Sequence, residues 1–505
     1  MHRYYVLCLL SALLLTIQNA QAIEVSGSVS GRWTASDNPV TVIDNITVDA
    51  EKSLYVDPGV IIYVNDNVEF EVNGLLDMRG TTRNPIIIDS NNGGYWGGIF
   101  INDAVSQDGR MRYVKLYHTI AGIIVNNSYF YVNNCDISVE WRNDRHNDVA
   151  IASRDGSHLT VELSNASIIS GLSDVTVVEG SYSTLQFDSS EVYLDIFNET
   201  GINNGYGTGV RLDHVSGSMK GCYLDLVSMN AVNSSGPLIG IDIISADDFL
   251  IHNNGIHIVT GSSIWSAAVA VQSTNIDINH FSIHLQPTAP AANIVGVGVR
   301  SESRVELKNT IIANFDDAYF DNCYSCFSWA ITSNINVRFC DIYNMVNPEN
   351  PEINYQENLD SDPQWREDES KYRLSANSPC IDMGELGSID PDNTRLDIGM
   401  HYYDQSNNKV ELEKVSIQPA DFILESIYPN PFNSNVIINI NNGSRQHLNV
   451  KIYNVIGSYV TDISRYYNKG SNIISWNGAD LSSGVYFVNI SSTNTAITKK
   501  IELLR

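Results

Sequence analysis

The chain of 505 residues has few cysteines and few positive charges, and it has no long hydrophobic run after its first residues. It carries 7 cysteines, one of them, Cys8, near the N-terminus. For so long a chain, disulfides are not expected to be the main source of stability. No later stretch approaches the roughly 20 apolar residues that a membrane helix needs. We therefore predict no transmembrane segment.

Positive charge is scarce relative to negative charge. The chain has 30 Lys and Arg against 58 Asp and Glu, so its net charge is −28. Such a field repels nucleic acid, anionic lipid and polyuronate chains at long range. It is compatible with neutral glycans, cationic partners or divalent metal ions. We predict that nucleic acid is not a partner.

The N-terminus has the three parts of a secretory signal. Arg3 provides a basic start, an apolar run follows over 6–17, and small residues end it at Ala20 and Ala22. Cys8 has no small-residue lipobox before it, so a lipid anchor is not expected. We predict a signal peptide at residues 1–22. Its removal takes away Arg3 and no acidic residue, so the net charge becomes −29.

The body of the chain, residues 23–404, is rich in short Val, Ile and Tyr alternations interrupted by Asn, Asp, Gly and Ser, a pattern typical of many short strands. Similar segments recur at 241–245 (IDIIS), 269–273 (VAVQS) and 297–301 (VGVRS), with a spacing of 28. A related segment, VRLDH, lies at 210–214. Such repeats predict a β-solenoid, in which each coil buries its face only by stacking on its neighbours.

A second strand in each unit follows a turn position. That position is predicted to hold Asn134, Asn165, Glu191, Gly221, Asn253, His280 and Asn309 in successive units. Asn suits such a corner because it tolerates left-handed backbone and its amide can bond to the coils on both sides.

Both ends of the body resemble right-handed parallel β-helix proteins of bacteria. The N-terminal matches include GRW at 31–33, DPGV at 57–60 and WGGI at 96–99. The C-terminal matches include SPCID at 378–382 and DPDNTRLDIG at 390–399. The resemblance implies an all-β, pectin-lyase-like solenoid. It implies no particular chemistry, because this fold serves lyases, esterases, hydrolases and adhesins alike.

A polar stretch at 405–425 is predicted to be a linker, and a compact strand pattern occupies 426–505. Strands of five to eight residues separated by turns predict a small antiparallel β-sandwich of about seven strands. The pattern opens with YPNPFN at 428–433 and ends with a basic pair before the last apolar residues.

The order of these pieces resembles the C-terminal sorting domain of type IX (Por) secretion substrates. The resemblance implies a Gram-negative source, recognition by the type IX secretion machinery at the outer membrane, and a protein that is secreted or attached to the cell surface. The residues that carry the sorting motif are Tyr428, Pro429, Asn430, Pro431, Phe432, Gly484, Tyr486, Lys499 and Lys500.

The cysteines that remain after signal removal allow two interpretations. Cys323 and Cys326 have the spacing of metal ligands, which with Cys340 and Cys380 would make a four-thiolate zinc site. The spacing is otherwise irregular, and Cys340 occupies the position that Cys135 holds in another coil. We therefore favour buried thiols, with Cys323 and Cys326 as disulfide candidates.

Asp390, Asp392 and Asp397 are the candidate metal ligands. Alternating Asp residues on a tight turn can offer oxygens to Ca²⁺, although the glycine and closing Glu of an EF-hand are absent. The alternative is an Asx-rich turn that caps the last coils. No cofactor is required in either interpretation. A catalytic role for His280 or His284 is not favoured, because His280 occupies the turn position that elsewhere holds Asn.

The outward face of the repeated strand is the candidate ligand site. Side chains alternate along a strand, so the residues between the inward Ile and Val pairs point outward. Stacking then aligns Arg211, Asp213, Asp242, Gln272 and Arg300 on one surface. The alternative is an ordinary solvated face.

Three functions remain open. The first is non-catalytic binding of glycan or extracellular matrix, which the sequence favours. The second is a polysaccharide lyase or glycosidase, which the paired carboxylates and the arginines would serve. The third is a purely architectural surface element. The known motifs of polysaccharide-active β-helix enzymes are not recognisable, so no catalytic residue is predicted.

Overall fold

The computed structural model describes residues 23–104, 106–141, 149–170, 174–196, 206–228, 237–246, 248–261, 265–288, 292–314, 327–329, 333–344, 353–366, 372–406, 422–443, 445–455, 458–479, 481–492 and 496–504. The predicted signal peptide and most of the predicted linker lie outside these residues. The chain divides into two compact units, Met1–Asp404 and Gln405–Arg505.

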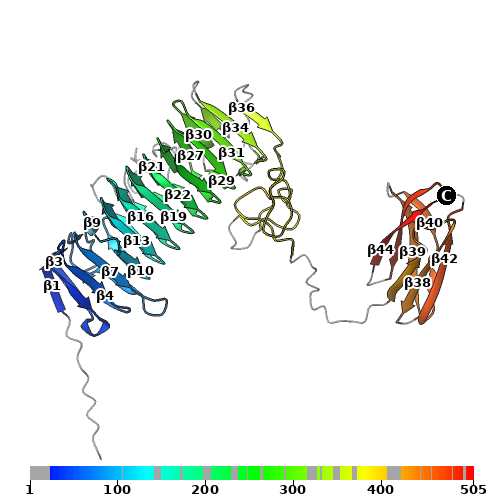
Figure 1. Ribbon diagram of the computed structural model, residues 1–505, viewed down its shortest axis with the longest axis horizontal. Helices are drawn as coiled ribbons and strands as arrows, with labels where there is room; N and C mark the ends of the chain where they lie inside the picture. Colours follow the sequence, from blue (N-terminus) through cyan, green and yellow to red (C-terminus); the bar gives the residue numbers. More distant parts are fainter. Residues whose placement is uncertain are drawn as a thin grey trace, which may run out of the picture. The chain divides into compact units, whose positions relative to one another are not determined.

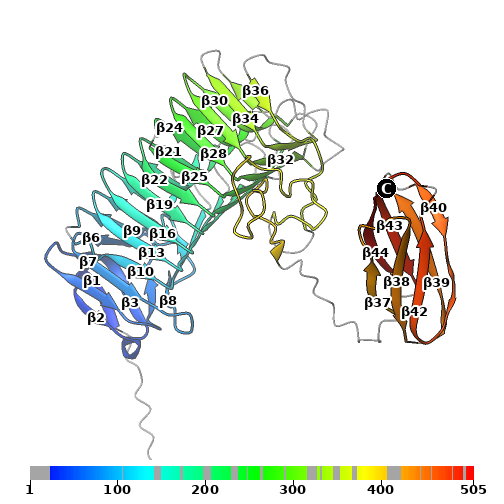
Figure 2. The same ribbon diagram turned by 45° about the vertical axis from the view of Figure 1, so that its right-hand side comes forward.

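The first unit is a parallel β-solenoid, as predicted. Each coil contributes strands to three faces, and every strand pairs in parallel with its counterpart in the next coil. Figures 1 and 2 show these strands lying side by side along the solenoid. Two of the faces, A and B, belong to one 23-stranded sheet, and face C is a separate 13-stranded sheet. The only helix of the described residues is a 3₁₀ turn, Ala35–Asp37.

The 23-stranded sheet begins with β1 (Ile23–Ser28) and β3 (Val40–Val48), from which both of its faces extend. Face A consists of β5 (Ile61–Val64), β8 (Ile86–Ser90), β11 (Val114–Thr119), β14 (Asp136–Trp141), β17 (Asn165–Ser170), β20 (Glu191–Ile196), β23 (Tyr223–Ser228), β26 (Gly255–Thr260), β29 (Ser282–Pro287), β32 (Ile311–Asn314) and β35 (Asp341–Tyr343). Face B consists of β6 (Glu69–Val72), β9 (Gly98–Asn102), β12 (Ile123–Asn126), β15 (Val149–Arg154), β18 (Val175–Ser181), β21 (Gly207–Asp213), β24 (Leu238–Ile244), β27 (Ser266–Gln272), β30 (Ile294–Arg300) and β33 (Phe327–Trp329).

Face C consists of β2 (Gly31–Trp33), β4 (Ser53–Val56), β7 (Leu75–Arg79), β10 (Arg110–Arg112), β13 (Tyr129–Asn133), β16 (His158–Glu162), β19 (Thr184–Asp188), β22 (Ser216–Lys220), β25 (Phe249–His252), β28 (Asn275–Asn279), β31 (Arg304–Lys308), β34 (Asn334–Arg338) and β36 (Ile353–Gln356).

The predicted repeat matches the strand register. Ile241 pairs with Val269, and Val269 pairs with Val297, so the segments spaced by 28 residues are one position in successive coils. The side chains of all three are completely buried. They belong to a single hydrophobic core that runs through the solenoid. The alternation predicted from the sequence therefore separates the solenoid core from the outward side of this face, on which Ile239, Ala267, Ala270 and Val295 form a separate buried cluster.

The corners are joined by polar side chains that point inward. At the corner between faces C and A, the Cys222 amide donates to Oδ1 of Asn254 in the next coil at 2.9 Å, and the Phe281 amide donates to Oγ1 of Thr310 at 3.3 Å. Thr274 accepts in the same way at the corner between faces B and C, from the Ala246 amide at 2.8 Å. Because a corner amide has no strand partner, each of these bonds removes a buried donor that would otherwise be unsatisfied.

The predicted turn positions are correct in five units and wrong in two. Asn134, Gly221, Asn253, His280 and Asn309 all have positive φ. In the other two units the positive-φ residues are Leu163 and Ser189, each two residues before the predicted Asn165 and Glu191. A shift of two residues keeps every side chain on the same side of a strand, so alternation alone could not detect the error.

A segment with little regular structure, described over residues 357–366 and 372–404, packs on the outer side of face A. The Tyr372 ring lies 5.5 Å from that of Tyr223, the Met400 amide donates to Oγ of Ser282 at 2.9 Å, and the Gly399 amide donates to the Asn309 carbonyl at 2.8 Å. It therefore covers the outward side of strands β23, β29 and β32.

The second unit is a β-sandwich of eight described strands, one more than the sequence predicted. One sheet is β37 (Phe422–Tyr428), β38 (Asn435–Asn442) and β42 (Gly470–Asn477). The other is β40 (Tyr459–Asp462), β39 (Gln446–Asn454), β43 (Gly484–Ser491) and β44 (Ala496–Leu503), with β41 (Arg465–Tyr467) also paired to β39. The unit has its own hydrophobic core.

Replacing Asn254 by Ala tests the corner bonds. The completely buried amide of Asn254 accepts from the Cys222 amide and donates to the Met219 carbonyl at 3.1 Å. Losing both partners leaves two buried backbone groups unpaired, which lowers the free energy of unfolding by about 3 kcal/mol. Urea unfolding of the mature chain, followed by circular dichroism, measures the change. The exposed Asn165→Ala is the control and is expected to shift it by less than about 0.5 kcal/mol.

Candidate functional site

A groove crosses the outward side of face B. Its volume is about 990 Å³. Its lining comes from strands β15, β18, β21, β24 and β30 and from residues that directly precede β18, β21, β24 and β27. The charged lining residues are Arg154, Asp174, Glu179, Arg211, Asp213, Asp242 and Arg300. From β15 to β30 there are five inter-strand steps of about 4.8 Å, so the face B groove extends over roughly 24 Å.

Charges alternate along the groove because of the strand register. In one outward column Glu179 pairs with Arg211, and Arg211 with Asp242. In the neighbouring column Arg154 aligns with Ser181, and Ser181 with Asp213. Opposite charges on adjacent strands stabilise each other, whereas like charges would destabilise the sheet.

Several of these groups are already held in place. Arg154 donates to both carboxylate oxygens of Glu179, at 2.9 and 2.7 Å. Asp213 lies 2.7 Å from Nδ1 of His214, and the Asp174 carboxylate accepts from the Tyr206 amide at 3.1 Å. The groove therefore presents positioned side chains.

Asp242 has a perturbed acidity. Burial raises its pKa above the ordinary Asp value, and the nearby Arg211 and Arg300 guanidinium groups counteract this only in part. A carboxyl group with a raised pKa in a groove is a candidate proton donor, although structural carboxyls are perturbed in the same way.

Two aromatic residues complete the groove. Tyr206 is 57% exposed and directly precedes β21. Trp265 directly precedes β27 and packs on the outward apolar cluster that contains Ile239. The Arg300 guanidinium lies 4.1 Å from the centroid of the Trp265 ring. Trp265 thus forms a fixed wall, while the Tyr206 ring is open to a ligand.

The structure brings together four of the five predicted ligand-binding residues. Arg211, Asp213, Asp242 and Arg300 line the face B groove. Gln272 pairs with Arg300 in the register but does not line the groove. The sequence analysis missed Glu179 and Arg154, which the register places one and two coils before Arg211. It also missed Tyr206 and Trp265, which precede strands and therefore leave no mark in an alternation pattern.

The three candidate metal ligands lie in one turn, and their carboxylates accept protein hydrogen bonds. Asp390 accepts from the Asp397 amide at 2.8 Å, Asp397 accepts from the amides of Asp382 and Tyr403, and Asp392 accepts from the Thr394 amide. Of these bonds, only the one from the Thr394 amide to Asp392, two residues earlier, has the spacing of an Asx turn. Burial and the nearby Asp397 carboxylate raise the pKa of Asp390 to about 6.

The described cysteines are free thiols. Cys135, Cys222, Cys340 and Cys380 are buried, and burial raises the pKa of the first three to about 12. Cys323 and Cys326, the disulfide candidates, lie outside the described residues. In the part of the chain that is described, no group of three or more His, Cys, Asp or Glu side chains could hold a metal ion.

His280, in the turn before β29, and His284, in β29, are partly buried, and their pKa values are low. His280 has the positive φ of a turn residue, and burial lowers its pKa to about 4. His284 stacks on His257 with a centroid distance of 4.6 Å, and burial lowers its pKa to about 3. Both are therefore neutral near neutral pH.

The predicted sorting motif joins the first and last strands of the second unit. Asn430 donates to the Lys500 carbonyl at 3.1 Å and accepts from the Glu502 amide at 2.8 Å. Phe432 is buried, and its amide donates to the Glu502 carbonyl at 2.8 Å. Its ring lies 5.6 Å from that of Trp476. Phe432 thus packs into the core of the sandwich.

The other residues of the sorting motif lie in or next to strands β37, β43 and β44. Tyr486 is buried in β43 and donates from its hydroxyl to the Ser482 carbonyl at 2.8 Å, whereas Tyr428 is half exposed at the end of β37. Gly484 begins β43, and Lys499 and Lys500 are exposed on β44. Pro429 and Pro431 follow β37 and flank Asn430.

These features define an all-β exported protein, a parallel β-solenoid followed by a sorting sandwich. Residues 426–503 match the family described as the secretion system C-terminal sorting domain. The chain is therefore secreted or attached to the cell surface, and its C-terminal unit is recognised by the type IX secretion machinery. Among the described residues, no helix is long and apolar enough to cross a membrane.

A solved structure is similar to this chain at low sequence identity. The crystal structure of pectate lyase Pel9A is similar with a TM-score of 0.26 and 12% identity, over 69% of this chain and 88% of that chain. No curated protein matches the chain.

The carboxylates of Asp390, Asp392 and Asp397 are not grouped as metal ligands in the structure, so a Ca²⁺ site there remains a prediction, which chelation tests. If Ca²⁺ neutralises these carboxylates, EGTA lowers the melting temperature of the mature protein, because like charges are then left close together. Asp390→Asn is expected to abolish the difference between the EGTA-treated and Ca²⁺-loaded samples. Differential scanning calorimetry measures it. An EGTA-treated sample that melts at the same temperature as the loaded one contradicts the prediction.

Proposed function

We propose that this exported protein binds a neutral glycan chain, without turnover, in the face B groove. The observation that carries the proposal is the combination, along one groove, of alternating positioned charges with the exposed ring of Tyr206. Extracellular matrix or cell-surface polysaccharide would be the natural source of such a ligand.

The charge balance of the groove supports a neutral ligand with many hydroxyl groups. Three guanidinium groups donate hydrogen bonds, and four carboxylates accept them. Sugar hydroxyl groups can both donate and accept hydrogen bonds, so they can pair with either kind of group. The net charge of −28 disfavours a polyanion in the same place.

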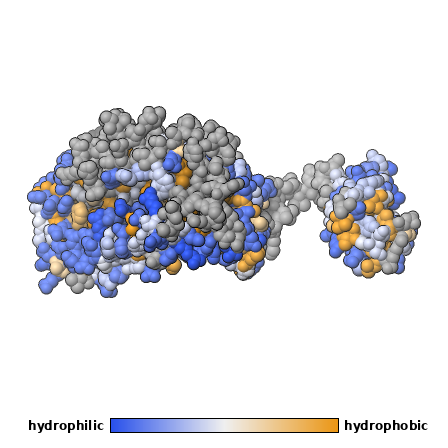
Figure 3. Space-filling view, turned by 90° about the horizontal axis from the view of Figure 1, so that it is seen from above, coloured by the Kyte–Doolittle hydropathy of each residue, from blue (hydrophilic) through white to orange (hydrophobic). Residues whose placement is uncertain are grey.

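The shape and surface of the solenoid also support a chain-like ligand. The groove crosses successive coils, so it offers similar contacts at regular intervals to a repeating polymer. In Figure 3 the described surface of the solenoid that faces the viewer is mainly hydrophilic with scattered hydrophobic residues, which disfavours an extended apolar partner on that side. Tyr206 provides the flat apolar face with a polar tip on which a sugar ring can stack.

Replacing Tyr206 by Ala tests the proposal. Loss of the stacking ring is expected to weaken binding by about tenfold, which corresponds to about 1.4 kcal/mol. A ligand is first chosen by screening the mature protein against an array of neutral β-glucan, xylan, galactan and mannan oligosaccharides. Isothermal titration calorimetry then compares the variants.

Tyr129→Ala is the matched control. Tyr129 is also an exposed tyrosine, but it stacks on His158 on face C, away from the groove. Its replacement is expected to leave binding unchanged. Failure of the array to show any neutral glycan would instead favour the architectural function, and equal losses in both variants would place the site elsewhere.

A polysaccharide-active enzyme is the second candidate. The raised pKa of Asp242 favours it, because a glycosidase needs one protonated carboxyl as a general acid and a second carboxyl close by. Asp213, in the neighbouring column of the preceding coil, is the available second group.

A turnover assay separates the two candidates. We expect no release of reducing ends and no absorbance of unsaturated uronates when the mature protein is incubated with a polysaccharide panel. Turnover that Asp242→Ala abolishes, while the control Asp44→Ala, an exposed position on β3 that lines neither pocket, retains it, would replace the binding proposal by the enzymatic one.

A further inference from the structure

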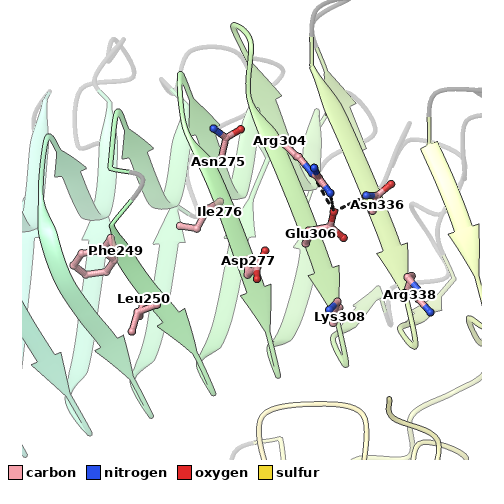
Figure 4. A pocket seen from close by; sticks show the side chains of 10 residues that line it. All are labelled: Phe249, Leu250, Asn275, Ile276, Asp277, Arg304, Glu306, Lys308, Asn336 and Arg338. Carbon is pink, nitrogen blue, oxygen red and sulfur yellow. Dashed lines mark hydrogen bonds and ion pairs between the residues drawn. The ribbon is translucent and has the colours of Figure 1, made fainter. Parts of the chain in front are cut away.

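A second pocket lies on the outward side of face C, on strands β25, β28, β31 and β34. Its volume is about 1000 Å³, and Figure 4 shows its lining residues. Three of the ten are apolar, and the other seven are polar or charged. The face C pocket shares no lining residue with the face B groove.

One end of the pocket is internally paired. Arg304 donates to Oε1 of Glu306 from Nε at 3.1 Å and from Nη2 at 2.5 Å. Asn336 donates to the same oxygen at 2.6 Å. These bonds to Arg304 and Asn336 lower the pKa of Glu306 despite its partial burial. The positions of all three side chains are therefore fixed in the absence of any ligand.

The other end holds two adjacent cations. Lys308 pairs with Arg338 in the register of β31 and β34, so the two lie next to each other in one outward column (Figure 4). The Lys308 ammonium lies 3.6 Å from the Glu385 carboxylate, and its charge also acts on Glu306, two residues earlier on β31. Within the described part of the chain, no carboxylate lies within 4.0 Å of Arg338, and its buried Nε has no hydrogen-bond partner.

This arrangement is unfavourable when the pocket is empty. Like charges directly opposite on neighbouring strands destabilise a sheet, and a buried donor without an acceptor costs free energy. An oxyanion between Lys308 and Arg338 would offset the repulsion between the two cations, because a guanidinium forms strong, charge-assisted hydrogen bonds to carboxylate and sulfate oxygens.

We propose that the face C pocket binds a sugar unit that bears a single oxyanion, a carboxylate or a sulfate ester, with this group held by Lys308 and Arg338. The other lining residues of the pocket suit a sugar as the molecule that bears this oxyanion. Asp277 and the amides of Asn275 and Asn336 can bond to hydroxyl groups, and the 66% exposed Leu250 provides an apolar contact for a ring face. The single charge follows from the net charge of −28, since a polyanion is repelled by the protein as a whole.

Calorimetric titration with matched oligosaccharides tests the proposal. The probes are xylotriose carrying one glucuronate, xylotriose carrying one sulfate ester, and neutral xylotetraose. We expect at least one acidic probe to bind at least tenfold more tightly than the neutral one. A preference for glucuronate or for sulfate identifies the oxyanion. We also expect binding to weaken as salt is added, because exposed charges are screened.

The variants locate the site. Arg338→Met and Lys308→Met are each expected to weaken binding of the acidic probe at least tenfold. Arg112→Met, an exposed arginine on β10 of the same face, is the matched control and should have no effect. Tyr206→Ala should also have no effect, which separates this site from the face B groove. If Arg338→Met does not fold, Arg338→Lys and Lys308→Met still decide the question.

Three results would overturn the proposal. They are the absence of binding by either acidic probe, equal binding of the acidic and neutral probes by Tyr206→Ala, in which the face B groove is weakened, and an equal loss in Arg112→Met and Arg338→Met. Binding of a short Asp- and Glu-containing peptide in place of all the sugars would assign the pocket to a protein partner and would also overturn it.

Discussion

The solenoid depends on the pairing of its corner amides with polar side chains of the next coil. Within the strands, backbone partners follow from parallel stacking, but at a corner the amide leaves the ladder while remaining buried. Asn254 and Thr274 accept such amides from the coil before them. At the C-terminal end Asn358 does the same for the Cys340 amide, from a residue outside any strand. A coil is thus complete only when a neighbour follows it, which is why the array needs a closing segment.

Because the core and the corners hold the fold, the outward columns can vary in chemistry. Stacking brings residues about 30 positions apart in the sequence to within about 5 Å of each other across neighbouring strands. On face B this places Glu179 beside Arg211, and Arg211 beside Asp242. On face C it places Lys308 beside Arg338. The same geometry yields a charge-balanced groove on one face and a pair of cations on another.

The sequence predicted the solenoid because burial imposes alternation and stacking imposes the repeat. The same repeat predicted that Arg211 and Asp242 share a surface. It failed at Asn165 and Glu191, since a shift of two residues leaves the alternation unchanged. Tyr206 and Trp265 could not be found in this way, because they precede strands. Lys308 and Arg338 were missed because they lie on face C, whose register the repeated face B segments do not reveal.

The sequence by itself determined the class of fold and the route of export, because both depend on local patterns. These are period-two alternation, recurrence of the coil, and the short motif around Asn430 and Phe432. The tertiary structure alone decided which outward residues meet, how far the face B groove extends, and which cation lacks a carboxylate. Those properties depend on register between coils and on the segment that packs against face A. Neither is contained in any single repeat, because each arises only when separate coils come into contact.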